Sequence, residues 1–295
     1  MLARFWGVTG TVSAPGLASD WSAAVGNTTC IELSWEDRTV VYDGGTGFIS
    51  FGEHVLGQLG DDPKATKQID LVLSHPHFDH INGLLFSPLI YDPRASITLH
   101  ASASTLSALG LLLGPDSGMS RVFLPSTFSD MQGLRRMVEI EPGRPFMLGD
   151  ARVETMALRH PGGCLAFRVT RNGASMVLAS DHEHPVFGAD ADLARFSKDA
   201  NLVYTEGQYT RAEYEGKEAI GAGLPIMRRG WGHSAMEDCV ATAISAGCQR
   251  LILGHHDPLR PLDSLKMITE NLRALVGPGG PSIGMAREGE SIVVG

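Results

Sequence analysis

The chain has 295 residues, of which 43% are hydrophobic and 19% charged, a composition typical of a folded globular protein with a sizeable core. Its 24 Lys and Arg against 33 Asp and Glu give a net charge of −9, and its densest basic runs are single Arg pairs, so a long nucleic-acid partner is not expected. No apolar stretch reaches the ~18 residues that a membrane span needs, and the N-terminal residues lack the apolar region of a signal peptide.

The four cysteines are far apart and form no C-x-x-C pair: Cys30, Cys164, Cys239 and Cys248. Reduced thiols and a cytoplasmic location are the expectation for such a chain. There is no repeat of fixed period and no low-complexity linker. The sequence therefore predicts one domain over residues 1–295.

Short β-branched segments bounded by turn residues predict strands. In chain order they are Cys30–Leu33, Thr39–Tyr42, Ile69–Leu73, Ile97–His100, Val153–Ala157, Leu165–Thr170, Met176–Ala179, Leu202–Thr205, Leu251–Leu253 and Ile292–Val294. Helical spacing predicts helices at Phe51–Leu59, Ala103–Leu112, Thr127–Met137, Ala235–Ala246 and Leu262–Leu275. Ser234 and Glu237 predict a capping box at the start of the fourth helix. This alternation indicates a layered α/β protein with two mixed sheets between helices.

Four potential metal ligands follow directly after one apolar strand: His75, His77, Asp79 and His80. Pro76 favours an extended conformation at His75, and side chains two apart in an extended segment share a face. His75 and His77 can therefore reach one ion, while a turn into a helix lets the other two address a neighbouring ion. Imidazole with carboxylate suits Zn, Fe, Mn or Ni better than Ca. The segment from Leu85 to Gly149 carries no such cluster and is expected to cover one edge of the cleft.

The pattern H-x-H-x-D-H after a strand resembles the signature of the metallo-β-lactamase fold superfamily. Later motifs follow the order of that family: Arg159-His160-Pro-Gly-Gly, Ser180-Asp181 after a strand, and Gly254-His255-His256-Asp257 after another. The resemblance implies an α/β fold, a four-layer αββα sandwich of two mixed sheets flanked by helices. It also implies two divalent metal ions, with Zn as the first choice and Mn, Fe or Ni as alternatives.

The same resemblance implies a ligand set, with His75, His77 and His160 on one ion and Asp79, His80 and His255 on the other. Asp181 would bridge the two ions. His256 is the alternative to His255 for the last position. Conventional β-lactamases carry a late Cys ligand and lack a residue like His80, so antibiotic hydrolysis is not expected.

Several stretches resemble the phosphodiesterase-like branch, which includes tRNase Z and the cyclic phosphodiesterase of phosphonate breakdown. They are Arg4 to Gly10, Gly26 to Cys30, Asp43-Gly-Gly-Thr-Gly47 and Trp231-Gly-His233-Ser234. By this resemblance His233 and Asp79 are the catalytic residues, and His233 assists proton transfer near the scissile phosphate. A His before a helix N-terminus is suited to that role, although His233 could instead only pack beside Trp231.

Four further residues are expected around the ligands or beside the substrate: Asn27, Asp43, His182 and His256. The chain lacks the Lys-rich arm with which tRNase Z grips its RNA. Together with the acidic balance, this favours a small or cyclic phosphodiester, hydrolysed by a metal-bridging hydroxide. The alternatives are a hydrolase of a carbon ester, lactone or thioester, and a metal-binding sensor or iron–oxygen protein. A homodimer is left open by the resemblance.

Overall fold

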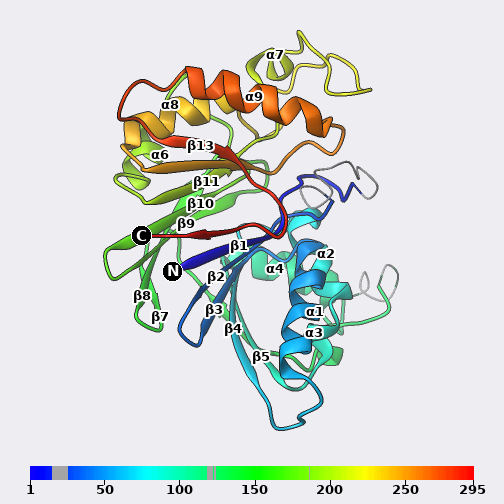
Figure 1. The fold of residues 1–295 in the computed structure, drawn as a ribbon. Helices are drawn as coiled ribbons and strands as arrows, with labels where there is room; N and C mark the ends of the chain where they lie inside the picture. The colour runs from blue at the N-terminus through cyan, green and yellow to red at the C-terminus, as the bar shows by residue number, and fades with distance from the viewer. Residues whose placement is uncertain (15–25, 118–121, 123, 186) are drawn as a thin grey trace.

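The computed structural model describes residues 1–14, 26–117, 122, 124–185 and 187–295. Two seven-stranded sheets lie face to face, with helices on their outer faces (Figure 1). No helix in the described part of the chain is both long and apolar enough to cross a membrane.

The first sheet contains β1 (Leu2–Gly7), β2 (Cys30–Trp35), β3 (Arg38–Tyr42), β4 (Lys67–Val72), β5 (Ala95–Ala101), β6 (Leu134–Glu139) and β14 (Ser291–Val293). The second contains β7 (Phe146–Leu148), β8 (Ala151–Leu158), β9 (Cys164–Arg171), β10 (Ala174–Ala179), β11 (Leu202–Glu206), β12 (Arg250–Gly254) and β13 (Ser282–Met285). The helices are α1 (Gly47–Leu59), α2 (Phe78–Phe86), α3 (Pro88–Tyr91), α4 (Ala103–Leu113), α6 (Ala191–Phe196), α7 (Arg211–Tyr214), α8 (Met236–Ala246) and α9 (Leu262–Ala274), with a 3-10 turn at Phe128–Asp130.

The order of strands is β14-β1-β2-β3-β4-β5-β6 in the first sheet and β13-β12-β11-β10-β9-β8-β7 in the second. Both sheets are mixed, because β3 to β6 and β10 to β13 run parallel while the remaining pairs are antiparallel. The predicted fold class, an α/β sandwich of two mixed sheets flanked by helices, is confirmed.

Three apolar clusters hold the layers together. One lies between the sheets and contains Tyr42, Phe167 and Tyr204, all fully buried. The second packs the first sheet against its helices, and the third packs the other sheet against α8 and α9. Central strands are therefore buried on both faces, which explains why their sequences read as continuous apolar runs.

Two local predictions are wrong. Residues 127–137 do not form a helix, because Leu134–Glu139 pairs in parallel with β5 and sheet hydrogen bonds override the helical spacing. Ser234 does not cap α8: its hydroxyl donates to the carbonyl of His182, and Glu237 instead accepts the amide of Arg211. Both side chains are engaged by neighbouring loops rather than by their own helix.

Candidate metal centre

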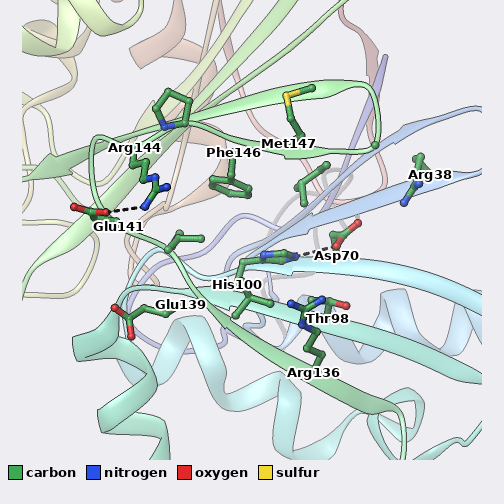
Figure 2. Close-up of a pocket in the computed structure, with 15 residues that line it drawn as sticks. Arg38, Asp70, Thr98, His100, Arg136, Glu139, Glu141, Arg144, Phe146 and Met147 are labelled. Carbon is green, nitrogen blue, oxygen red and sulfur yellow. Dashed lines mark hydrogen bonds and ion pairs between the residues drawn. The ribbon is translucent and has the colours of Figure 1, made fainter.

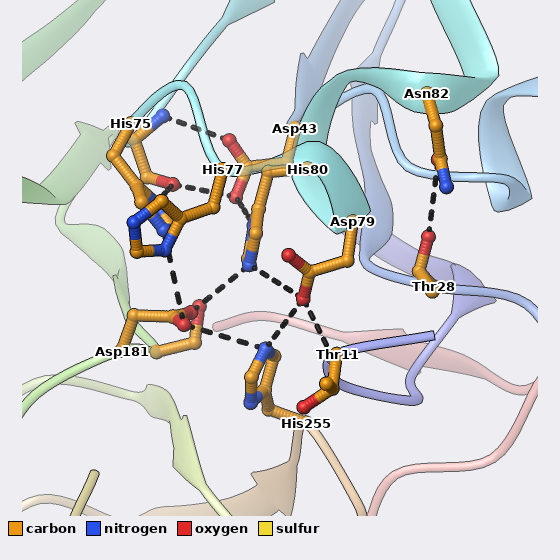
Figure 3. A network of polar contacts seen from close by, with 12 residues as sticks. Thr11, Thr28, Asp43, His75, His77, Asp79, His80, Asn82, Asp181 and His255 are labelled. Carbon is orange, nitrogen blue, oxygen red and sulfur yellow. Dashed lines mark hydrogen bonds and ion pairs between the residues drawn. The ribbon is translucent and has the colours of Figure 1, made fainter. Parts of the chain in front are cut away.

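The histidine-rich segment lies where β4 ends and α2 begins (Figure 3). His75 is fully buried after the strand, and His77 occupies the position preceding α2 in extended backbone. Asp79 and His80 then lie in the first turn of the helix. The change from extended chain to helix is the one that the sequence predicts, and it points the two halves of the motif to different neighbours.

The first donor group consists of His75, His77 and His160, whose candidate ligand atoms lie within 4.8 Å of one another. Nε2 of His160 is 2.9 Å from Nδ1 of His77. The other nitrogen of His160 donates to the carbonyl of Gly232 at 2.9 Å, which orients the ring and leaves Nε2 facing the group.

The second donor group consists of Asp79, His80 and His255, again within 4.8 Å. Oδ2 of Asp79 lies 3.3 Å from Nε2 of His80 and 3.3 Å from Nε2 of His255. Both groups match the two ligand sets that the resemblance implies.

Asp181 lies between the two groups. Its Oδ1 is 4.0 Å from Nε2 of His75 and 3.9 Å from Nε2 of His160, whereas its Oδ2 is 3.3 Å from Nε2 of His80. Oδ1 also approaches Nε2 of His255 at 3.4 Å. One carboxylate therefore faces both groups, as a bridging ligand must.

The donor atoms fit divalent metal ions. Among the described residues, Nε2 of His75, Nε2 of His80 and Oδ2 of Asp181 are buried without a hydrogen-bond partner. A buried polar atom left without a partner costs about 1–3 kcal/mol, so three of them at one place need another explanation. Imidazole nitrogens and carboxylate oxygens that converge in this way are the ligands of Zn, Mn and Fe.

Asp43 connects the two groups from behind. It is fully buried and accepts hydrogen bonds from Nδ1 of His80 and from the hydroxyl of Ser74, both at 2.8 Å. The Ser74 oxygen in turn lies 2.9 Å from Nδ1 of His75. Because both histidines donate through Nδ1, both present Nε2 to the centre, and a single carboxylate sets the orientation of the two rings.

The charges of the centre compensate one another. Burial lowers the pKa of His75 well below its ordinary value. Burial also lowers the pKa of His80, but the carboxylates of Asp181 and Asp79 outweigh it and hold that pKa well above the ordinary value. Conversely, burial raises the pKa of Asp181, but His255 and His80 outweigh it and hold that pKa well below the ordinary value. A metal ion would take the place of the histidine protons.

The N-terminal segment closes one side of the centre. The amide of Thr11 donates to Oδ2 of Asp79 at 2.7 Å, and the side-chain amide of Gln208 donates to the hydroxyl of Thr11 at 3.0 Å. A Cβ at Gly10 would lie 2.4 Å from the ring of His255, so only glycine fits there. This contact explains the glycine in the motif that follows β1.

Of the two consecutive histidines, His255 belongs to the centre and His256 turns away from it. Nδ1 and Nε2 of His256 lie 3.4 Å and 3.2 Å from the carbonyl oxygens of Gly207 and Ala286. Burial lowers the pKa of His256 to about 4, so its ring is neutral. The backbone places these side chains on opposite sides because His255 has a φ of 55°.

Two other expected neighbours of the ligands make their hydrogen bonds elsewhere. His182 is buried, with Nε2 3.0 Å from Oδ2 of Asp190. The amide of Asn27 donates to the carboxylate of Glu288 at 2.5 Å. Neither contact involves a donor of the centre, so these residues support adjoining loops.

His233 lies over the centre together with Glu206, which the sequence reasoning missed. Nδ1 of His233 is 3.4 Å from Oε1 of Glu206 and 3.9 Å from Oδ1 of Asp181, and its ring stacks on His255 at 5.2 Å. Trp231 is 51% exposed and is contacted by an arginine, so packing beside Trp231 does not explain the position of His233.

The strand order brings Glu206 to the centre, although no sequence motif marks it. It closes β11, which lies between β10 and β12, and those two strands lead to Asp181 and His255. Parallel strands end at one edge of a sheet, so a carboxylate at the end of the middle strand is brought to the same place. Glu206 is fully buried, and its Oε1 accepts the amides of Asp181 and His182.

A cavity of about 310 Å³ adjoins the centre. His160 lines it together with Arg159, Arg229 and Glu183. The carboxylate of Glu183 accepts the amides of Gly230 and Gly232 and thereby fixes the turn that leads to His233. The arrangement as a whole is an acid- and histidine-rich metal centre at one rim of an αββα sandwich, open to a small cavity.

A family model described as the beta-lactamase superfamily domain matches residues 38–256. The chain belongs to this superfamily. The match confirms the resemblance that the motifs indicate, and with it the class of enzyme, a metal-dependent hydrolase.

The chain is 25% identical over 218 residues to the probable metallo-hydrolase YhfI of Bacillus subtilis, covering 72% of this chain and 78% of YhfI. Zn(2+)-bound PqqB from Methylobacterium extorquens superposes with a TM-score of 0.72 at 15% identity, covering 99% of this chain and 100% of PqqB. A diphosphatase of the PhnP family superposes with a TM-score of 0.65 at 14% identity, covering 99% and 97%. At such identities the two structures show the shared fold alone.

Proposed function

We propose that the protein hydrolyses a small phosphodiester at a centre of two divalent metal ions, with zinc as the first metal to test. His75, His77 and His160 would hold one ion, Asp79, His80 and His255 the other, and Asp181 would bridge them. When bound, two such ions lower the pKa of water and neutralise charge on phosphoryl oxygens.

The observation that carries the phosphodiester proposal is the position of His233. Its Nδ1 lies 3.4 Å from Glu206, and the side chain is 11% exposed, so it can reach a bound substrate. A carboxylate that accepts from Nδ1 directs the opposite nitrogen, Nε2, to the substrate, and in the imidazolium form this nitrogen can donate a proton to a departing alkoxide. Asp79, held by the amide of Thr11, would orient the attacking water from the other side.

The adjoining cavity supports a small substrate. Its volume of about 310 Å³ is at the lower end of the range for small-molecule sites. Arg159 and Arg229 supply positive charge at its wall, which suits an anion. The net charge of −9 remains unfavourable for a long nucleic acid.

The proposal is tested with a His233→Ala variant assayed on two substrates, a bis-aryl phosphodiester and a 2′,3′-cyclic nucleotide. The alkoxide that leaves from the cyclic nucleotide needs a proton donor, so kcat for this substrate should fall by about a hundredfold. An aryl leaving group needs no such donor, so kcat for the bis-aryl phosphodiester should change far less. Metal analysis of the same samples should show an unchanged metal content.

The matched control is His54→Ala, which removes a histidine that contacts Gln58 away from the centre and should change neither substrate. Full turnover of the cyclic nucleotide by the His233 variant would refute the proton-donor role. A wild-type sample with two metals that is inert on both phosphodiesters but cleaves a lactone or thioester would favour the carbon-ester alternative. Bound iron together with oxygen consumption would favour the other alternative, a metal-binding sensor or iron–oxygen protein.

A further inference from the structure

A second cavity, of about 570 Å³, opens between the β5–β6 edge of the first sheet and β7 of the second (Figure 2). It lies apart from the metal centre along the same strands. Arg38 and Asp70 line it from within β3 and β4, whereas Asp43 and His75 follow the ends of these strands. The two sites are therefore reached from different sides of the sandwich.

The floor of this cavity is a polar row on the inner face of a sheet. Asp70, Thr98 and Arg136 are direct partners across β4, β5 and β6, so all three side chains point to the same face. The next residue of the row on β3 is Val40, which is buried in the core between the sheets. Inner faces of packed sheets are normally apolar, so the polar row marks the place where the core gives way to the cavity.

One wall combines a part-buried hydrogen bond between His100 and Asp70 with an aromatic ring. Nε2 of His100 lies 2.9 Å from Oδ1 of Asp70, and the ring of Phe146 stacks on that of His100 with 5.7 Å between centroids and 18° between planes. His100 is 7% exposed, and its Nδ1 has no hydrogen-bond partner among the described residues. Leu148, on the same face of β7 as Phe146, adds apolar surface.

The arginines of the cavity are unevenly neutralised. Arg144 is paired with Glu141 at 3.5 Å. Arg38 and Arg136 have no carboxylate within ion-pair distance in the described part of the chain, since the nearby Asp70 is engaged by His100. Glu139 also lines the cavity and has no basic partner among the described residues, so two guanidinium groups and one carboxylate are left without an ion pair there.

We propose that this cavity binds a small organic oxyanion, a phosphate monoester or a carboxylate, at a site separate from the metal centre. Arg38 and Arg136 would contact the ligand from opposite ends of the row, three strand spacings apart, and guanidinium groups bind both kinds of oxyanion in bidentate fashion. Thr98 would add a hydroxyl donor, and the apolar body of the ligand would lie against Phe146 and Leu148. The volume is within the usual range for a metabolite-sized ligand. This inference does not depend on the reaction at the metal centre.

The test is an NMR titration of the full-length, metal-loaded protein with three probes: inorganic phosphate, adenosine monophosphate and benzoate. A His100→Gln variant assigns the imidazole resonance of His100, which reports on this cavity alone. A saturable shift of that resonance is expected for at least one probe, with a concentration dependence separate from any shift of His160 and His255 caused by binding at the metal centre. Comparison of the phosphate and carboxylate probes identifies the preferred oxyanion.

Arg38→Gln and Arg136→Gln should each weaken the binding by about tenfold, since each removes a charge-assisted contact. Arg135→Gln is the matched control. It removes one positive charge from the same strand, but Arg135 does not line the cavity and donates to the carbonyl of Pro93. A resonance that does not move with any probe at millimolar concentration would overturn the proposal. Equal weakening by Arg135→Gln would also overturn it, since binding would then follow bulk charge.

Discussion

The metal centre and the second cavity, called here the β5–β6 cavity after the strands at its edge, are two polar regions of one sandwich. Their side chains are arranged in opposite ways. At the centre, donors from several strand ends converge to within 4.8 Å, and most are fully buried. In the cavity, Asp70, Thr98 and Arg136 stand side by side across three strands, so they are spaced by the sheet itself. Convergent donors suit a point charge, whereas a row with the spacing of strands suits an extended ligand.

The comparison also shows how each region is neutralised. Carboxylates and imidazoles alternate at the centre, and a single buried group, Asp43, orients rings of both donor groups. In the cavity Asp70 bonds to His100 and Arg144 pairs with Glu141, which leaves Arg38, Arg136 and Glu139 without an ion-pair partner among the described residues. The centre is therefore sensitive to loss of any member, whereas the cavity is expected to lose affinity in steps.

The largest effect is expected from Asp181→Ala. Removing the carboxylate that faces both donor groups should lower kcat/KM by more than about a hundredfold, because loss of a residue that only supports a ligand already costs 10–100-fold. Elemental analysis should show metal loss in parallel, with an unchanged circular dichroism spectrum. The His100 resonance should keep its response to the oxyanion probes. A variant that retains both metals would contradict the bridging role.

An intermediate effect is expected from a matched pair, Asp43→Asn and Asp70→Asn. Each replaces a carboxylate that accepts from a histidine; Asp43 is fully buried and Asp70 is partly buried. Asp43→Asn should weaken metal binding by about 10–100-fold, because its NH2 group must replace either the oxygen that accepts the Ser74 amide or the oxygen that accepts Nδ1 of His80 and the Ser74 hydroxyl. Asp70→Asn should leave metal affinity unchanged. Competition with a chromophoric chelator measures the metal affinity of each variant. Equal affinities would show that Asp43 supports the metal ligands no more than Asp70 does.

The smallest effect concerns a carboxyl group outside both regions. Burial raises the pKa of Glu288 to about 7, although hydrogen bonds from Asn27 oppose the shift. The folded state therefore holds this proton more tightly than the unfolded state, whose value is 4.5, and stability falls as pH rises from 4.5 to 7.

A Glu288→Gln variant should accordingly show a flatter dependence of its urea midpoint on pH in this window. Glu290→Gln, at an exposed neighbour, is the control and should keep the slope of the parent protein. An unaltered slope in the Glu288 variant would show that this carboxyl does not titrate in the window.

Much of the centre was predictable because its chemistry is local. His75, His77, Asp79 and His80 occupy one strand end, and strand ends also carry Asp181 and His255, so short motifs were sufficient. Glu206 was missed since a single Glu after a strand carries no motif, and only the neighbouring strands give it meaning.

The remaining misses have a common cause, which is that distant partners decide local structure. The β6 strand was expected as part of a helix, and β1, β7 and β13 were not expected at all. The β5–β6 cavity could not be predicted from the sequence for the same reason. Arg38, Asp70, Thr98 and Arg136 come from four strands, and their shared face is created only by the register of the sheet.

Three residues of the metal centre adopt left-handed backbone conformations, which residues other than glycine rarely adopt. They are Asp43, Asp181 and His255, with φ values of 61°, 62° and 55°. Such conformations cost about 1 kcal/mol or more each, and glycine would relieve them. Glycine would however remove contacts that its neighbours need: at Asp43 it would leave Nδ1 of His80 and the Ser74 hydroxyl without their buried acceptor, at about 1–3 kcal/mol each. The same contacts that build the site thus hold its backbone in an unfavourable conformation.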